Sequence, residues 1–163
     1  MKEVSINKNM HLSEHFTLGE VTKTSVKTAG NNIPSHVAIE NLKNLCENWL
    51  EELRENYNLI YEGVGDCKGD EPIIITSGYR SAEVNKAVGG APTSNHLTGC
   101  AVDIRCAGIE QAIRYACILL DISDGTKRDY DELFIERSKQ GRYWVHFAVR
   151  PKENRRKTAF IQT

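Results

Sequence analysis

The sequence predicts an α+β protein in which helices pack on a small, mostly antiparallel sheet. Two segments, residues 35–56 and 108–122, have apolar side chains at helical spacing. Four short segments are typical of strands: 72–80, 101–105, 130–137 and 142–150. The last two are separated by a short loop that contains Gly141, as in a β-hairpin. Hairpin strands lie antiparallel, and helices packed on such a sheet define the α+β class.

The size of the chain fits one domain. Its 163 residues suffice for a substantial core but are few for two domains. We therefore expect a single domain over residues 1–163, with a wrapping segment at 1–33 and a basic surface tail at 151–163. An apolar fraction of 40% and a charged fraction of 26% are typical of a soluble globular protein. The net charge of −1 gives no reason to expect a nucleic acid or a membrane as partner, and we expect a monomer.

The N-terminus and the cysteines both indicate the cytoplasm. Residues 1–16 lack the apolar stretch of a signal peptide, and no segment stays apolar over the ~18 residues of a membrane span. The five cysteines are an odd number without a C-x-x-C pair. We therefore expect reduced thiols rather than a disulfide framework or a zinc knuckle.

The predicted helices have recognisable ends. Pro34 precedes the long helix at 35–56 and suits the start of a helix. A shorter helix is expected within 81–90, where Ser81 is a suitable N-cap and two glycines end the segment. The segment 93–105 follows this shorter helix and ends in the strand predicted over 101–105.

That segment, TSNHLTGCAVDIR, contains a histidine and a carboxylate seven residues apart. On one continuous strand, His96 and Asp103 would point to opposite faces. Gly99 lies between them and permits a turn that brings the two side chains back together. The pair is then either two ligands of one metal or a hydrogen-bonded structural pair.

A second histidine, His146, lies in the last predicted strand. Two imidazoles and one carboxylate suit Zn²⁺ and leave a fourth position for water, as catalytic sites require. Each residue also has a simpler interpretation, because histidines in strands are often hydrogen-bonded core residues. Spacing alone leaves both interpretations open.

The residues around this set resemble the zinc D-Ala-D-Ala carboxypeptidase family. That family has the pattern S-x-H-x-x-G-x-A-x-D, followed by W-x-H or W-H near the C-terminus. The matching residues here are Ser94, His96, Gly99, Ala101, Asp103, Trp144 and His146. Four further segments match in the same order, namely HFTLGEV, NLKNLCENWLEELR, YDELFIE and NRR. They resemble the short, single-domain branch common in phages and prophages.

The resemblance implies a fold shared with phage L-alanyl-D-glutamate endopeptidases and with the zinc-bearing domain of hedgehog proteins. It also implies that zinc is bound by His96, Asp103 and His146. Arg80 matches the arginine that anchors a substrate carboxylate, a task suited to the guanidinium fork. Ser94 matches a position beside the metal where it can hydrogen-bond substrate. Trp144 and Val145 alternate faces around His146, so we expect one to fill the core and Trp144 to form a wall of the site.

The general base is where the sequence departs from many relatives. They have an acidic residue three positions before the last histidine, where this chain has Tyr143, which cannot accept a proton at neutral pH. The hairpin suggests another carboxylate, because pairing of its strands makes Glu136 and His146 neighbours. We therefore assign Glu136 as the base, with Asp131 or Glu132 as alternatives.

Together these features predict a zinc-dependent peptidase that acts on peptidoglycan stem peptides. The bond is either D-Ala–D-Ala, cut by a carboxypeptidase, or L-Ala–D-Glu, cut by an endopeptidase. The alternative is a non-catalytic, zinc-bearing module that binds the cell wall or forms part of a phage. We expect synthesis in the cytoplasm and release to the wall by phage lysis or injection, although a host enzyme would have the same sequence features.

Overall fold

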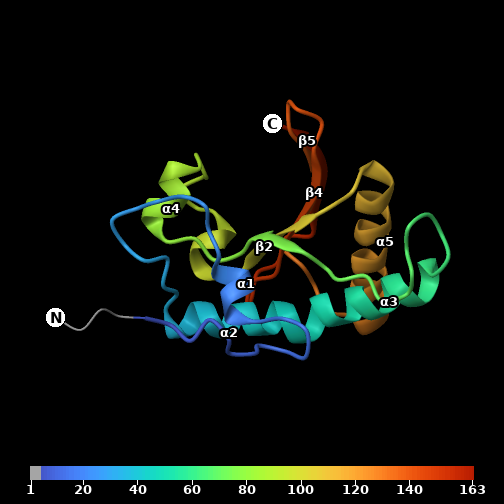
Figure 1. The fold of residues 1–163 in the computed structure, drawn as a ribbon, viewed down its shortest axis with the longest axis horizontal. Coiled ribbons are helices and arrows are strands. Elements are labelled where there is room, and N and C mark those ends of the chain that lie inside the picture. The colour runs from blue at the N-terminus through green and yellow to red at the C-terminus, as the bar shows by residue number, and fades with distance from the viewer. Residues whose placement is uncertain (1–4) are drawn as a thin grey trace.

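The computed structural model describes residues 5–163 and confirms the α+β class (Figure 1). Its five-stranded sheet has the order β1-β2-β4-β3-β5. The strands are β1 (Ile75–Ser77), β2 (Ala101–Arg105), β3 (Glu132–Arg137), β4 (Tyr143–Ala148) and β5 (Lys157–Gln162). Three of the four pairings are antiparallel, and only β3 and β5 run parallel. The predicted mostly antiparallel sheet is therefore confirmed.

The helices surround this sheet. They are α1 (Leu18–Thr22), α2 (His36–Leu45), the π-helical turn η1 (Cys46–Leu50), α3 (Glu51–Tyr61), α4 (Ala82–Ala87), the 3₁₀ helix η2 (Asn95–Thr98) and α5 (Ile109–Thr126). The helix expected at 35–56 is thus longer and is interrupted by η1. Figure 1 shows α2 and α3 as one long rod, with α5 beside the sheet. None of the helices in residues 5–163 is both long and apolar enough to cross a membrane.

The long rod begins at His36, within one residue of the predicted start at 35. The Ser35 hydroxyl accepts a hydrogen bond from the backbone of Ala38, so Pro34 stands just outside the helix. One face of the rod is fully buried, and the Trp49 ring packs 5.1 Å from that of Phe147 in β4. This contact joins the rod to one face of the sheet.

Alternation along β4 separates the core from the other face. Val145 and Phe147 are fully buried in the core, whereas His146 between them points to the opposite side. The hairpin between β3 and β4 forms as predicted, with Gly141 at a φ of +80°. A one-residue slip of this register would exchange the two faces.

The C-terminal segment differs from the surface tail that the sequence predicts. Residues 157–162 form β5, which pairs with β3 and leaves most of its side chains exposed. The pairing satisfies backbone groups of β3 that would otherwise lie at the edge of the sheet. A basic composition therefore did not exclude a strand.

The N-terminal segment lies against the start of the sheet, although residues 1–4 of the predicted wrapping segment fall outside the described residues. The carbonyl of Val21 accepts a hydrogen bond of 2.7 Å from the backbone of Tyr79. A side chain at Gly78 would overlap that same carbonyl oxygen. This close approach ends β1 at Ser77, earlier than the strand predicted over 72–80. No disulfide joins any of the five cysteines, all of which lie within the described residues.

Candidate metal centre

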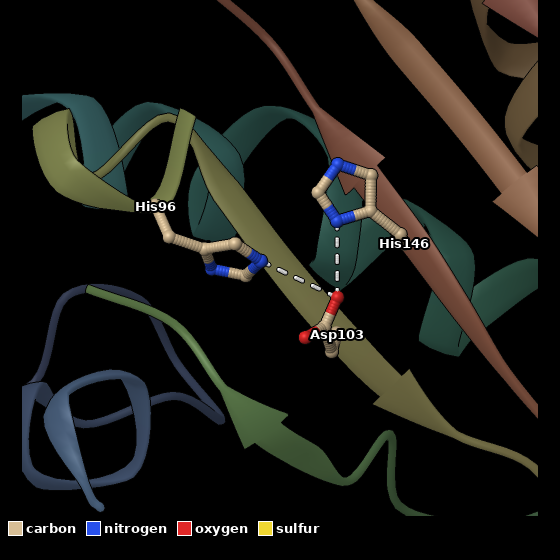
Figure 2. A group of neighbouring side chains, drawn as sticks. All are labelled: His96, Asp103 and His146. Carbon is tan, nitrogen blue, oxygen red and sulfur yellow. Dashed lines mark hydrogen bonds and ion pairs between the residues drawn. The ribbon is translucent and has the colours of Figure 1, made fainter. Parts of the chain in front are cut away.

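Three side chains from separate elements converge on the face of the sheet opposite the core. Asp103 in β2 lies directly across from His146 in β4, and its Oδ1 is 3.0 Å from His146 Nδ1. His96 from η2 points its Nε2 toward the same oxygen at 3.4 Å (Figure 2). All three are buried, and one ligand atom from each lies within 4.8 Å of the others. The predicted grouping of His96, Asp103 and His146 is therefore present.

A short turn brings His96 to this position. The hydroxyl of Ser94 accepts a hydrogen bond of 3.2 Å from the backbone of His96 and begins η2. The turn ends at Gly99, whose φ of +73° is unfavourable for any residue with a side chain. A Cβ there would also overlap the carbonyl oxygen of Ala38. The turn predicted at Gly99 therefore has two structural causes.

The second nitrogen of each histidine also has a partner. His96 Nδ1 lies 2.7 Å from the carbonyl oxygen of Gly78, which leaves Nε2 to face Asp103. His146 Nε2 lies 3.6 Å from a carboxylate oxygen of Glu132. Histidines that bind metals usually donate their other ring N–H to such acceptors. The donor set and its surroundings therefore fit a zinc ion.

The charges of the three residues depend on one another. Burial alone would raise the pKa of Asp103, but the charges and hydrogen bonds of His96 and His146 hold it well below its usual range. Burial alone would lower the pKa of His146, but the hydrogen bond to Asp103 and the nearby Glu132 carboxylate raise it to about 9. The raised pKa favours the protonated imidazole, so a metal cation at this site would compete with that proton.

Arg80 lies within the site, next to one of the predicted ligands. Its Nη2 donates to Asp103 Oδ2 at 3.1 Å and its Nε to Ser77 Oγ at 3.0 Å. Its Nη1 makes no hydrogen bond to the residues that the structure describes. Arg80 therefore orients a ligand carboxylate and keeps donors for another group, and its contact with substrate stays a prediction.

Glu136 occupies the same face as His146 and is its diagonal cross-strand neighbour, not the residue directly opposite. The register places Phe134 opposite His146, with ring centroids 5.4 Å apart, and places Glu136 opposite Trp144. Glu136 is therefore diagonal to His146. Burial, and then the nearby Asp103 carboxylate, raise the pKa of Glu136. This environment favours proton uptake.

The alternative bases have other partners. Asp131 is fully buried and accepts hydrogen bonds from Arg155 and Asn95, so it has no free oxygen to face a substrate. Glu132 also bonds to Asn95 and Arg155, and its interaction with His146 lowers its pKa. The geometry therefore favours Glu136 over both alternatives.

Two residues that contact the acidic residues of this site were not given a role from the sequence. Asn95 directly precedes His96, but an asparagine there is also typical of a turn. Arg155 belongs to the segment expected as a tail, and no local pattern predicts that it reaches Asp131. Side chains alternate along β3, so Glu132 and Glu136 lie on the same face of the strand. This alternation is the sequence feature from which the position of Glu132 on that face could be predicted.

Trp144 and Ser94 remain predicted substrate contacts. Trp144 is half-buried and lies between Arg105 and Glu136 in the register. Ser94 already has a structural role as the cap of η2.

Two comparisons connect this geometry to known proteins. Residues 14–123 match the family model described as peptidase M15. A zinc D-Ala-D-Ala carboxypeptidase of Streptomyces albus G is 30% identical over 91 residues, which are 55% of this chain and 31% of that protein. The match thus spans less than a third of that relative's length. The family and this relative imply zinc, for which the described residues provide a His-Asp-His group. The family model covers more than half of the residues of the chain, and the chain therefore belongs to the peptidase M15 family.

Proposed function

We propose that this protein is a zinc-dependent peptidase that hydrolyses the stem peptides of peptidoglycan. The main support is the buried group of His96, Asp103 and His146, in which three ligand atoms face one another and both outer ring nitrogens face acceptors. The name of the Streptomyces relative supports the substrate class. The proposal also includes release to the cell wall by phage lysis or injection.

In this proposal, a bound zinc ion supplies a Lewis acid for the scissile carbonyl and an activated water. Glu136 takes the proton from the attacking water and passes it to the leaving amine. Its raised pKa suits a group that must both accept and donate a proton near neutral pH. Its place diagonal to His146 puts the carboxyl group on the same face as the ligands.

The substrate is held by the chain's own side chains. Arg80 keeps N–H donors after its hydrogen bonds to Asp103 and Ser77, and these donate to a substrate carboxylate. Trp144 borders the same face and provides an apolar wall, while Ser94 contributes a hydroxyl beside His96. A carboxylate near the scissile bond is thus a requirement of the proposed substrate.

Two bonds in stem peptides meet this requirement. The D-Ala–D-Ala bond lies next to the terminal carboxylate of the intact stem peptide, and the L-Ala–D-Glu bond has a free carboxylate of D-Glu nearby. Arg80 alone does not distinguish them. The name of the relative makes release of terminal D-alanine the first product to seek.

Mass spectrometry of defined muropeptides, incubated with the zinc-loaded protein, tests the proposal. We expect metal-dependent products, whose masses reveal loss of one alanine or separation at L-Ala–D-Glu. A chelator-treated sample is the first control. Glu136→Gln is the second, and we expect it to reduce turnover about 10²–10⁴-fold while zinc content stays unchanged.

A different result would change the assignment. If the zinc-loaded protein cleaves no muropeptide yet binds intact peptidoglycan in a pull-down, it is a zinc-bearing binding module. If Glu136→Gln cleaves as fast as the unchanged protein, another group is the base.

A further inference from the structure

We infer that Glu132 is a positioning residue for the metal ligand His146, and that Asn95 and Arg155 hold Glu132 in this role. The inference rests on the proposed function, because it requires a metal at the His-Asp-His group. It gives the C-terminal segment, which the sequence predicts as a tail, a place in the metal centre.

The imidazole of His146 is held from three sides. Its Nδ1 faces Asp103 at 3.0 Å, and its Nε2 faces Glu132 Oε2 at 3.6 Å, which is an ion-pair distance rather than that of a short hydrogen bond. The ring of Phe134 stacks on it at an interplanar angle of 16°. Glu132 and Asp103 therefore select which nitrogen is directed into the site.

Glu132 is itself held by two donors at its other oxygen. Oε1 accepts from Asn95 Nδ2 and from Arg155 Nη2, the latter at 3.3 Å. These bonds turn Oε2 toward His146. Because Asn95 directly precedes His96, one side chain connects the elements that contain both histidines.

Arg155 is anchored beneath this carboxylate by Asp131. Its Nε and Nη2 donate to the two oxygens of Asp131 at 3.0 and 2.7 Å, in a bidentate pair. Asp131 is fully buried, and Arg150 adds a further contact at 3.2 Å. The fork of Arg155 therefore has a defined orientation, and the same Nη2 reaches Glu132.

This arrangement affects the metal through His146. A carboxylate that accepts the outer N–H fixes the tautomer and makes the inner nitrogen a stronger donor. Loss of such a partner typically costs 10–100-fold in metal affinity. Glu132 has its two oxygens occupied inside the protein, which distinguishes its role from the one proposed for Glu136.

The test measures zinc affinity by competition with a chromophoric chelator. We expect Glu132→Ala to weaken zinc binding about 10–100-fold. Glu132→Gln retains an acceptor oxygen, so its zinc affinity should decrease less than that of Glu132→Ala. Cobalt substituted for zinc provides a second readout, because a reoriented imidazole alters the visible absorption of Co²⁺.

Glu136→Gln is the matched control for charge. It removes a negative charge from the same face of the same strand, so we expect little change in zinc affinity. Arg155→Met and Arg156→Met form a second matched pair, because Arg156 contacts Asp124 and Asp129 instead of Glu132. We expect only Arg155→Met to weaken zinc binding.

The outcomes separate this inference from the proposed function. Unchanged zinc affinity and an unchanged cobalt spectrum in Glu132→Ala would overturn it, as would equal losses in Glu132→Gln and Glu136→Gln. If Glu132→Ala fails to fold, the comparison of the two glutamine variants decides. A protein that binds zinc, depends on Glu132 for it and cleaves nothing would support the positioning role and refute the catalytic one.

Discussion

Asp103 and His146 are separated by 43 positions in the chain, yet they face each other across β2 and β4 at 3.0 Å. Their contact depends on the register of the sheet, which is set on the opposite face by buried residues such as Val102 and Phe147. The apolar core thus positions the polar site. Four predictions follow from this and related features.

Replacement of Asp103 by asparagine should remove stoichiometric zinc binding. The neutral amide is a poorer ligand than the carboxylate, and it also loses the charge that His96 and His146 surround. Metal analysis after dialysis should find about one zinc per chain in the unchanged protein and much less in the variant. Asp129→Asn, at an exposed position, is the control. Retention of full zinc content by Asp103→Asn would mean that the site lies elsewhere.

Zinc should stabilise the folded protein in a concentration-dependent way. At a free zinc concentration about a thousandfold above the dissociation constant, binding adds about 4 kcal/mol to the free energy of unfolding. For a chain of this size the melting temperature should rise on the order of 10 °C. Calorimetry at several buffered zinc concentrations measures this rise, and Asp103→Asn should not show it. A melting temperature independent of zinc would contradict the prediction.

Replacement of Gly99 by alanine should destabilise the protein and disturb His96. Gly99 and Gly89 both have a φ of +73°, but only Gly99 packs closely against another backbone segment. Gly89→Ala, whose Cβ meets no described atom within 4 Å, should therefore cost only about 1–2 kcal/mol. Urea denaturation in the presence of a chelator should show a larger decrease in the free energy of unfolding for Gly99→Ala than for Gly89→Ala. Equal losses would mean that the contact with Ala38 is unimportant.

Asp131 should make stability depend on pH below about 4. Burial alone would raise the pKa of Asp131, but hydrogen bonds from Arg155 and Asn95 hold it well below its usual range. Its contribution is therefore present above the unfolded pKa and declines as the pH falls, because only the unfolded chain then takes up the proton. Asp131→Asn, which does not titrate, should lose about 1.5–3 kcal/mol at pH 7.

The difference in the free energy of unfolding between Asp131→Asn and the unchanged protein should be smaller at pH 3 than at pH 7. Urea denaturation of both proteins at the two pH values, with chelator present, measures it. The exposed position again provides a control, because Asp129→Asn should change little at either pH. A difference that stays constant between pH 7 and pH 3 would contradict the role of Asp131.

Short-range patterns in the sequence determined most of the helices and strands. Helical spacing, Pro34 before the long helix and the Ser81 cap depend on neighbours in the chain, so they were visible without the structure. The turn at Gly99 was also visible without the structure, because Gly99 lies between His96 and Asp103, which are close in the sequence. The α+β class could therefore be predicted from local patterns. The His-Asp-His group was predicted through the resemblance to the zinc D-Ala-D-Ala carboxypeptidase family, because spacing alone left it open.

Only the tertiary structure decided how distant segments meet. The register put Phe134 rather than Glu136 opposite His146, and no local pattern specifies which residues of two strands pair. Residues 157–162 became β5 because the edge of β3 was available, which is a property of the sheet and not of the segment. The fork of Arg155 reaches Glu132 and Asp131 across more than 20 positions. Such contacts depend on packing over the whole chain, whereas helix caps and turns depend on a few adjacent residues.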